Sequence, residues 1–206
     1  MQAGYTGITI LIGLLALVYL GLLERVLERM NLTRKTALAL LLLALLGSRL
    51  PTVTLYAGLS INLGGMLVPL GVAVYLLVTA GTARERQRAL LTIVIVTVIV
   101  WVIDRLFPLE PGLFALDIDP LFLPALVAAA AAYALGRSRR SAFIGALLGV
   151  LLIDLVAWGE NLVRGFRTIP VTLGGGGVFG AALVAAVLAV LLAEAVGEIR
   201  ESLHRR

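Results

Sequence analysis

The sequence predicts an all-α fold, a polytopic membrane bundle of about seven transmembrane helices. Of the 206 residues, 61% are hydrophobic and 14% are charged, whereas soluble domains average about 45–50% apolar and about 25% charged residues. The mean hydropathy is +1.06. The apolar residues gather in runs of bilayer-crossing length, and short basic clusters separate these runs. We therefore expect residues 1–206 to form a single integral membrane domain.

Six apolar runs have about the length that crosses a bilayer as a helix, the form that satisfies backbone groups in hydrocarbon. In chain order they cover residues 7–23, 64–81, 89–107, 120–136, 142–159 and 173–193. A seventh span is predicted near residues 36–58, where Pro51 interrupts the apolar residues. This segment is either one helix kinked at the proline or a short helix followed by a partly re-entrant piece that reaches Asn62.

Basic residues predict the orientation, because Lys and Arg collect in the short cytoplasmic loops of membrane proteins. Of the 17 basic residues, 13 follow the first, third, fifth and seventh spans. They are Arg25, Arg29, Arg34, Lys35, Arg84, Arg86, Arg88, Arg137, Arg139, Arg140, Arg200, Arg205 and Arg206. The N-terminus is therefore expected outside and the C-terminus inside.

Two similar segments predict an internal repeat. Residues 61–65 read Ile-Asn-Leu-Gly-Gly and open the third span, while residues 171–175 read Val-Thr-Leu-Gly-Gly and open the seventh. Two parallel triplets joined by the fourth helix would result, a three-plus-one-plus-three plan that resembles the SWEET and PQ-loop transporters. No Pro-Gln pair occurs in the chain, so the resemblance is only architectural. The alternative is chance, because Leu and Gly are so abundant that a repeated Leu-Gly-Gly is nearly expected.

The residue types that the chain lacks exclude some kinds of functional site. The chain has no Cys, and its single His is His204 in the charged tail, so thiolate metal sites and cysteine nucleophiles are excluded. The net charge of +5 is spread over loops between apolar runs, which is typical of topology signals and not of a nucleic-acid surface. No motif in the sequence indicates a particular cofactor or metal.

Asp104 and Asp154 are candidate binding residues because both fall within predicted spans. Asp154 lies about 18 Å into its helix at 1.5 Å per residue. A carboxylate near the bilayer centre costs about 2.5–3.5 kcal/mol, so it is expected to face the bundle or a wet cavity. The alternative is a structural ion pair, for Asp104 with Arg49 or Arg105.

Further candidates lie at the predicted helix starts. Asp117 and Asp119 precede Pro120, where they either cap a helix or hold a cation or a substrate amine at an entrance. Asn62 either caps a helix or contacts a ligand. The glycines of the two similar segments serve close packing, or they open the backbone toward a substrate. These glycines are Gly64, Gly65, Gly174 and Gly175. By the same reasoning, Gly145 and Gly149 predict close helix packing.

Three motifs carry a resemblance to a known family. They are Ile-Asn-Leu-Gly-Gly at 61–65 with Pro69, Asp117-x-Asp119-Pro120 with Pro124-Ala125, and the Gly-rich segment 174–180. Together they resemble domain-of-unknown-function family 1614, multipass membrane proteins of bacteria and archaea, over about residues 35–193. The resemblance implies a bacterial or archaeal cytoplasmic membrane location. It also implies an Asp after the Gly-rich stretch, where this chain has Gly180.

Three functions remain open. The first is binding or transport of a small polar solute or cation through an outward-facing acidic cavity lined by the candidate residues. The second is an intramembrane aspartyl hydrolase using Asp104 and Asp154, although the Tyr-Asp and Gly-x-Gly-Asp motifs of such enzymes are missing. The third is a membrane scaffold, with Asp154 paired to Arg164 and no cavity. An enzyme is the less expected class, and the oligomeric state is open.

Overall fold

The structure is a computed structural model that describes residues 2–30, 32–106, 122–136 and 138–204. It divides into two compact units, residues 1–42 and 43–206, which are described separately. Within the described ranges the fold is mostly helical, with seven α-helices, as the sequence predicts. Two of them, α4 (Ala83–Leu106) and α6 (Arg139–Val163), are long and apolar enough to cross a membrane. That these helices cross a membrane, the other predicted spans and the orientation all stay predictions.

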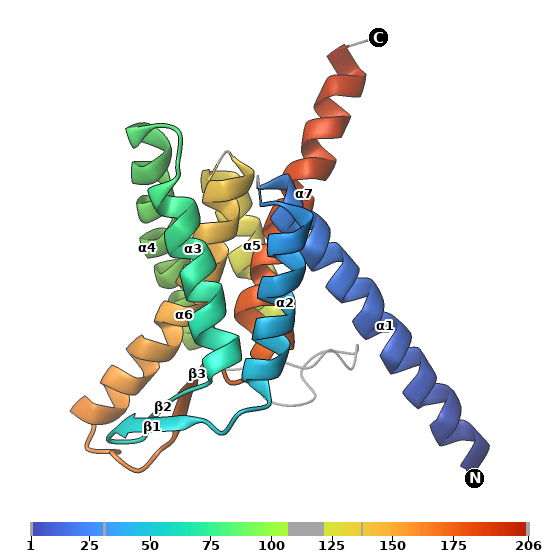
Figure 1. Ribbon diagram of the computed structural model, residues 1–206. Helices are drawn as coiled ribbons and strands as arrows, with labels where there is room; N and C mark the ends of the chain where they lie inside the picture. Colours follow the sequence, from blue (N-terminus) through green and yellow to red (C-terminus); the bar gives the residue numbers. More distant parts are fainter. Residues whose placement is uncertain (1, 31, 107–121, 137, 205–206) are drawn as a thin grey trace. The chain divides into compact units, whose positions relative to one another are not determined.

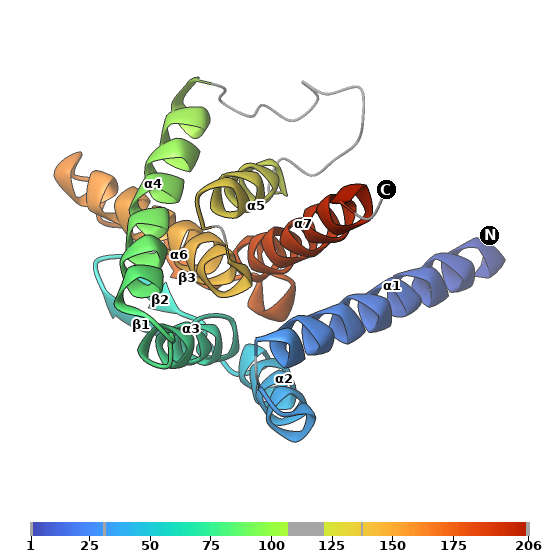
Figure 2. The ribbon, with the colours of Figure 1, turned by 90° about the horizontal axis from the view of Figure 1, so that it is seen from above.

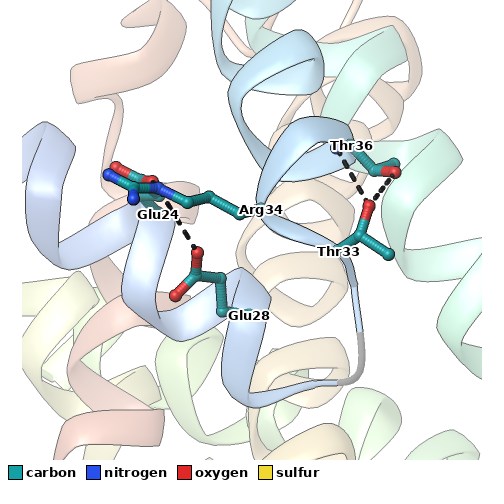
Figure 3. A network of polar contacts seen from close by, with 5 residues as sticks. All are labelled: Glu24, Glu28, Thr33, Arg34 and Thr36. Atoms are coloured by element: carbon teal, nitrogen blue, oxygen red, sulfur yellow. Dashed lines mark hydrogen bonds and ion pairs between the residues drawn. The ribbon is translucent and has the colours of Figure 1, made fainter.

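The first unit contains α1 (Gln2–Arg29) and the N-terminal part of α2 (Arg34–Ser48). Polar contacts fix the short connection between the two helices (Figure 3). Arg34 donates from Nε to Glu24 at 3.0 Å, and the Thr33 hydroxyl accepts the backbone N–H of Thr36 at 3.3 Å. The second contact is an N-terminal helix cap, which is why α2 begins here.

The second unit holds the C-terminal turn of α2 and the other five α-helices (Figure 1). Besides α4 and α6 these are α3 (Val68–Val78), α5 (Phe122–Gly136) and α7 (Ala181–His204). A π-helical turn, Leu63–Leu67, leads into α3, and a 3-10 turn, Gly177–Phe179, precedes α7. Figure 2 views the helices from above.

Contacts among polar residues define one end of this unit, which we call the basic end. Ser138 at the N-cap of α6 donates to Glu85 in the first turn of α4 at 3.1 Å, and Arg140 donates to the carbonyl of Thr79 after α3 at 3.0 Å. Arg139 pairs with Glu194 of α7 at 3.4 Å. The basic residues that begin α4 and α6 therefore lie at the same end of the unit.

A small sheet lies at the opposite end of the unit, and the all-α prediction missed it (Figure 1). Its strands, in spatial order, are β1 (Val53–Tyr56), β2 (Leu59–Ile61) and β3 (Val171–Leu173). The first two are antiparallel and the last two are parallel. Because α2 ends at Ser48 and strands follow, the structure has the short helix with a non-helical segment and not a helix kinked at Pro51.

The parallel pair joins the two segments that were predicted to be repeats. Leu59 pairs with Val171 and Ile61 with Leu173, so the strands lie side by side two residues out of the register that the sequence similarity suggests. Each strand leads through a short non-α turn into a helix, α3 or α7, that starts at the sheet end. The duplication itself stays a prediction.

Glycines set the spacing of α4 and α6. A Cβ on Gly145 would overlap the Thr92 side chain, and one on Gly149 would lie 2.6 Å from Cγ1 of Val96. Thr97 of α4 donates across this contact to the carbonyl of Gly149 at 3.1 Å. The packing role predicted for these two glycines is confirmed, since small residues let membrane helices approach closely.

Candidate functional site

Asp154 lies on a cavity of about 210 Å³ in the second unit. Four segments form its walls: α6, the strand β3 with the glycines that follow it, the start of α7, and the π-helical turn before α3. The lining residues are Gly65, Val150, Leu151, Asp154, Thr172, Gly174, Gly175, Gly176, Gly177, Gly180, Ala181 and Ala182. The walls are thus built mostly from small or apolar residues around one carboxylate.

Helix geometry explains why Asp154 reaches this cavity. Val150 and Leu151 precede it by four and three residues, the spacing that puts side chains on one helix face, and all three line the cavity. The buried stretch of α6, Ser141–Leu151, ends just before it, and Asp154 itself is half-buried. The Gly174 backbone donates a hydrogen bond to its carboxylate.

Two glycines form the floor of the site, where the segments leading to α3 and α7 touch. A Cβ on Gly65 would overlap the carbonyl oxygen of Gly174, and one on Gly174 would overlap the backbone of Gly65. Gly174 also has a positive φ of 66°, which favours glycine. Larger residues are therefore excluded at both positions, and the close approach of the two backbones depends on them.

Two of the other predicted site residues support this floor from outside the cavity lining. The Asn62 side chain accepts the backbone N–H of Gly65 at 2.8 Å, and its own backbone N–H donates to Leu173 at 3.0 Å. Asn62 is therefore a buried helix cap. Gly64 packs against the end of α2, where a Cβ would overlap the backbone of Ala44 and Ser48.

The structure does not bring Asp104 to the cavity. Asp104 is exposed in the last turns of α4 and is not among the lining residues. Its neighbour Arg105 forms an ion pair with Glu160 of α6 and stacks over the Trp101 ring at 5.4 Å, and Trp101 donates to Glu160 at 2.8 Å. This cluster, which the sequence did not predict, ties α4 to α6 beyond the apolar contact.

Asp117 and Asp119 lie outside the described residues. Thr172 lines the cavity but was not predicted, because a lone Thr in a strand is ordinary and no sequence signal places β3 against α6. Gly180, where the family resemblance implies an Asp, lines the same cavity. The position that differs from the resemblance therefore lies near Asp154.

Comparison with known proteins identifies a family and no individual relative. No curated protein and no solved structure matches the chain. The model of a family described as "Protein of unknown function (DUF1614)" matches residues 14–192. This range covers most of the chain and contains every described residue of the cavity. The chain therefore belongs to the DUF1614 family.

Proposed function

We propose that this protein is a multipass membrane protein that binds a small, singly charged cation at Asp154 and transports it through the bundle. The observation that carries the proposal is the position of Asp154 on a cavity otherwise lined by glycine, alanine and aliphatic residues and one Thr. Among the described lining residues Asp154 is the only charged one.

The charge of the cavity favours a cation as the ligand. A carboxylate in a poorly hydrated site is costly unless an opposite charge compensates it. The Gly174 backbone hydrogen bond supplies partial compensation, and no described ion pair joins Asp154 to Arg164 as the scaffold alternative expects. A bound cation would supply the missing countercharge.

The size and composition of the site favour a small monovalent cation. Pockets for drug-sized ligands measure about 300–1,000 Å³, whereas this cavity measures about 210 Å³. Within the described ranges no group of three or more His, Asp or Glu residues is placed to hold a metal ion. Ca²⁺ takes six to eight oxygen ligands, so an alkali ion or a small ammonium fits the single carboxylate better.

The membrane location rests on the outward faces of the helices. On α4 the exposed side chains include Leu90, Leu91, Val94, Val98 and Val102. A face of this kind is typical of lipid contact, because soluble monomers rarely expose large contiguous apolar patches. Together with the lengths of α4 and α6 and the family resemblance, it supports a bacterial or archaeal cytoplasmic membrane.

The transport step rests on the backbone at the site. Two helices, α3 and α7, begin beside each other after turns that are not α-helical, and the cavity lies at that point. Helices that start at the substrate site, next to backbone that is not α-helical, recur in secondary transporters. The hydrolase alternative needs both Asp104 and Asp154 at one point, and Asp104 is not in this cavity.

Cation binding is tested by thermal unfolding of the purified full-length chain in detergent. Sodium chloride and methylammonium chloride are the probes, and the chloride of N-methylglucamine, a bulky cation outside the proposed ligand class, keeps the ionic strength constant. A ligand at 100 times its Kd stabilises the folded state by about 2.7 kcal/mol. We expect at least one probe to raise the Tm of the wild type and not of Asp154→Asn.

Asp104→Asn is the matched control, since it removes the same charge from an exposed site on α4. It should keep the cation-dependent rise in Tm. An equal rise for Asp154→Asn and the wild type would remove Asp154 from the binding site and overturn the proposal.

A further inference from the structure

A second cavity, of about 190 Å³, lies at the basic end of the second unit. It lies between the first turn of α4 and the turn that joins α5 to α6. Arg84, Glu85 and Arg88 contribute from α4, Ser138 and Ser141 from the start of α6, and Thr82 from the turn before α4. This site shares no residue with the Asp154 cavity.

The two arginines of this cavity differ from their basic neighbours. Arg86 donates to Val78 at 3.2 Å, Arg140 to Thr79 at 3.0 Å, and Arg139 pairs with Glu194 at 3.4 Å. Within the part of the chain that the structure describes, neither Arg84 nor Arg88 makes a side-chain hydrogen bond or ion pair. Their spacing of four residues puts both guanidinium groups on one face of α4.

Hydroxyl groups hold the opposite wall in place. The Ser138 hydroxyl accepts the Ser141 backbone N–H at 3.1 Å and donates to the Glu85 carboxylate at 3.1 Å. Ser141 is fully buried, and its hydroxyl donates to the Glu85 carbonyl at 3.4 Å. Because the two serine donors are engaged, the guanidinium N–H groups and the hydroxyl of Thr82, which only accepts a hydrogen bond from the Glu85 backbone, are the side-chain donors left for a ligand in the described lining. Two Arg against one Glu leave the described lining with a net positive charge.

The position of the cavity along α4 and α6 indicates which kind of ligand can reach it. The apolar stretch of α4 begins at Ala89 and that of α6 at Ala142, immediately after the cavity residues. If these helices cross the bilayer, the cavity lies where phospholipid phosphates lie. Basic pockets between helices on the cytoplasmic side are suited to anionic headgroups, and Arg matches phosphate oxygens with paired N–H donors.

We propose that Arg84 and Arg88 bind a phosphate group in this cavity. The group comes from an anionic phospholipid of the inner leaflet or from a free phosphate anion, and the two sources differ in their test. The site is independent of cation binding at Asp154.

Thermal unfolding of the full-length chain in uncharged detergent tests the site. The probes are short-chain phosphatidylglycerol, short-chain phosphatidylcholine and inorganic phosphate, at constant ionic strength. Stabilisation by phosphatidylglycerol but not by inorganic phosphate identifies the lipid, and stabilisation by inorganic phosphate identifies the free anion. If neither raises the Tm of the wild type, the proposal is wrong.

Two double variants that remove the same charge at different positions test where phosphate binds. Arg84→Gln/Arg88→Gln should weaken the apparent affinity by about tenfold or more, because hydrogen bonds to charged groups are lost. Arg86→Gln/Arg140→Gln removes the same charge outside the cavity and should change affinity by less than about threefold. Equal losses in the two double variants would show general charge attraction and overturn the site.

Two single variants complete the design. Glu85→Gln removes the opposing charge from the lining and should increase affinity for phosphate; a decrease would contradict binding between Glu85 and the two arginines. Asp154→Asn should leave phosphate binding unchanged. The phosphate site and the proposed cation site can therefore be confirmed or contradicted independently.

Discussion

If Asp154 binds a cation as proposed, its charge should cost stability when no cation is present. Asn has nearly the shape of Asp and can still accept the Gly174 hydrogen bond, but it carries no charge. Without cations, Asp154→Asn should therefore unfold at the same temperature as the wild type or higher. This is the pattern expected of a functional residue, whose removal stabilises the fold while it removes activity.

The hairpin turn between β1 and β2 contains one residue with a strained backbone. Both turn residues have positive φ, 44° for Ala57 and 81° for Gly58, which is the type I′ pattern. Gly58 suits this conformation and Ala57 does not. The Ala57 carbonyl also accepts a hydrogen bond from Trp158 of α6 at 3.1 Å, which ties the turn to the helix that carries Asp154.

Ala57→Asn should relieve this strain, since Asn-Gly is the preferred pair for a type I′ turn. We expect the free energy of unfolding to rise by about 0.5–1 kcal/mol, measured by denaturant titration in detergent. Ala130→Asn, at an exposed position within α5 where Ala is the best helix former, is the matched control and should destabilise. A loss of stability for Ala57→Asn would contradict the turn geometry.

At the scale of the helices, the contact between α4 and α6 holds the wall that carries Asp154. Gly149→Ala places a Cβ 2.6 Å from the Val96 side chain. Overpacking of this kind costs about 1–3 kcal/mol. We expect a lower Tm in thermal unfolding and weaker cation binding, because α6 must shift.

Gly159→Ala is the matched control on the same helix, because a Cβ there meets nothing within 4 Å. Ala favours helix over Gly by about 0.8–1.0 kcal/mol, so this variant should be neutral or more stable. Equal Tm values for the two variants would contradict the helix contact.

The helices could be predicted from sequence and the sheet could not. Apolar runs with basic ends mark α4 and α6 directly. Residues 53–61, by contrast, follow Pro51 as a short apolar stretch that fits a continued span equally well. Their strand form depends on pairing with Val171–Leu173, a contact between distant segments that no local pattern encodes.

The candidate site was predictable in part for a similar reason. Asp154 was found because a carboxylate inside an apolar run must face something polar, and Gly65, Gly174 and Gly175 because their pattern repeats. Asp104 was chosen by its depth along a helix, which does not say where its side chain points. Thr172 was missed because only the fold brings β3 to α6.

For the molecule as a whole, the two ends of α4 and α6 should lie on opposite sides of the membrane. The chain has no cysteine, so a thiol reagent can label the protein only at a cysteine that is introduced. In intact cells, a membrane-impermeant thiol reagent should label Thr168→Cys, beyond α6, and should label Gln87→Cys, in the basic end, only after lysis. Both positions are exposed. The reverse pattern would contradict the orientation, and labelling of both before lysis would contradict the spans.

Uptake of radiolabelled Na⁺ and methylammonium into vesicles reconstituted with the full-length chain tests the central claim most directly. We predict saturable uptake of at least one of these cations above that of protein-free vesicles. It should fall to the protein-free level in Asp154→Asn and persist in Asp104→Asn. Uptake by Asp154→Asn equal to that of the wild type, or no uptake of either cation by the wild type, would contradict transport through the Asp154 cavity.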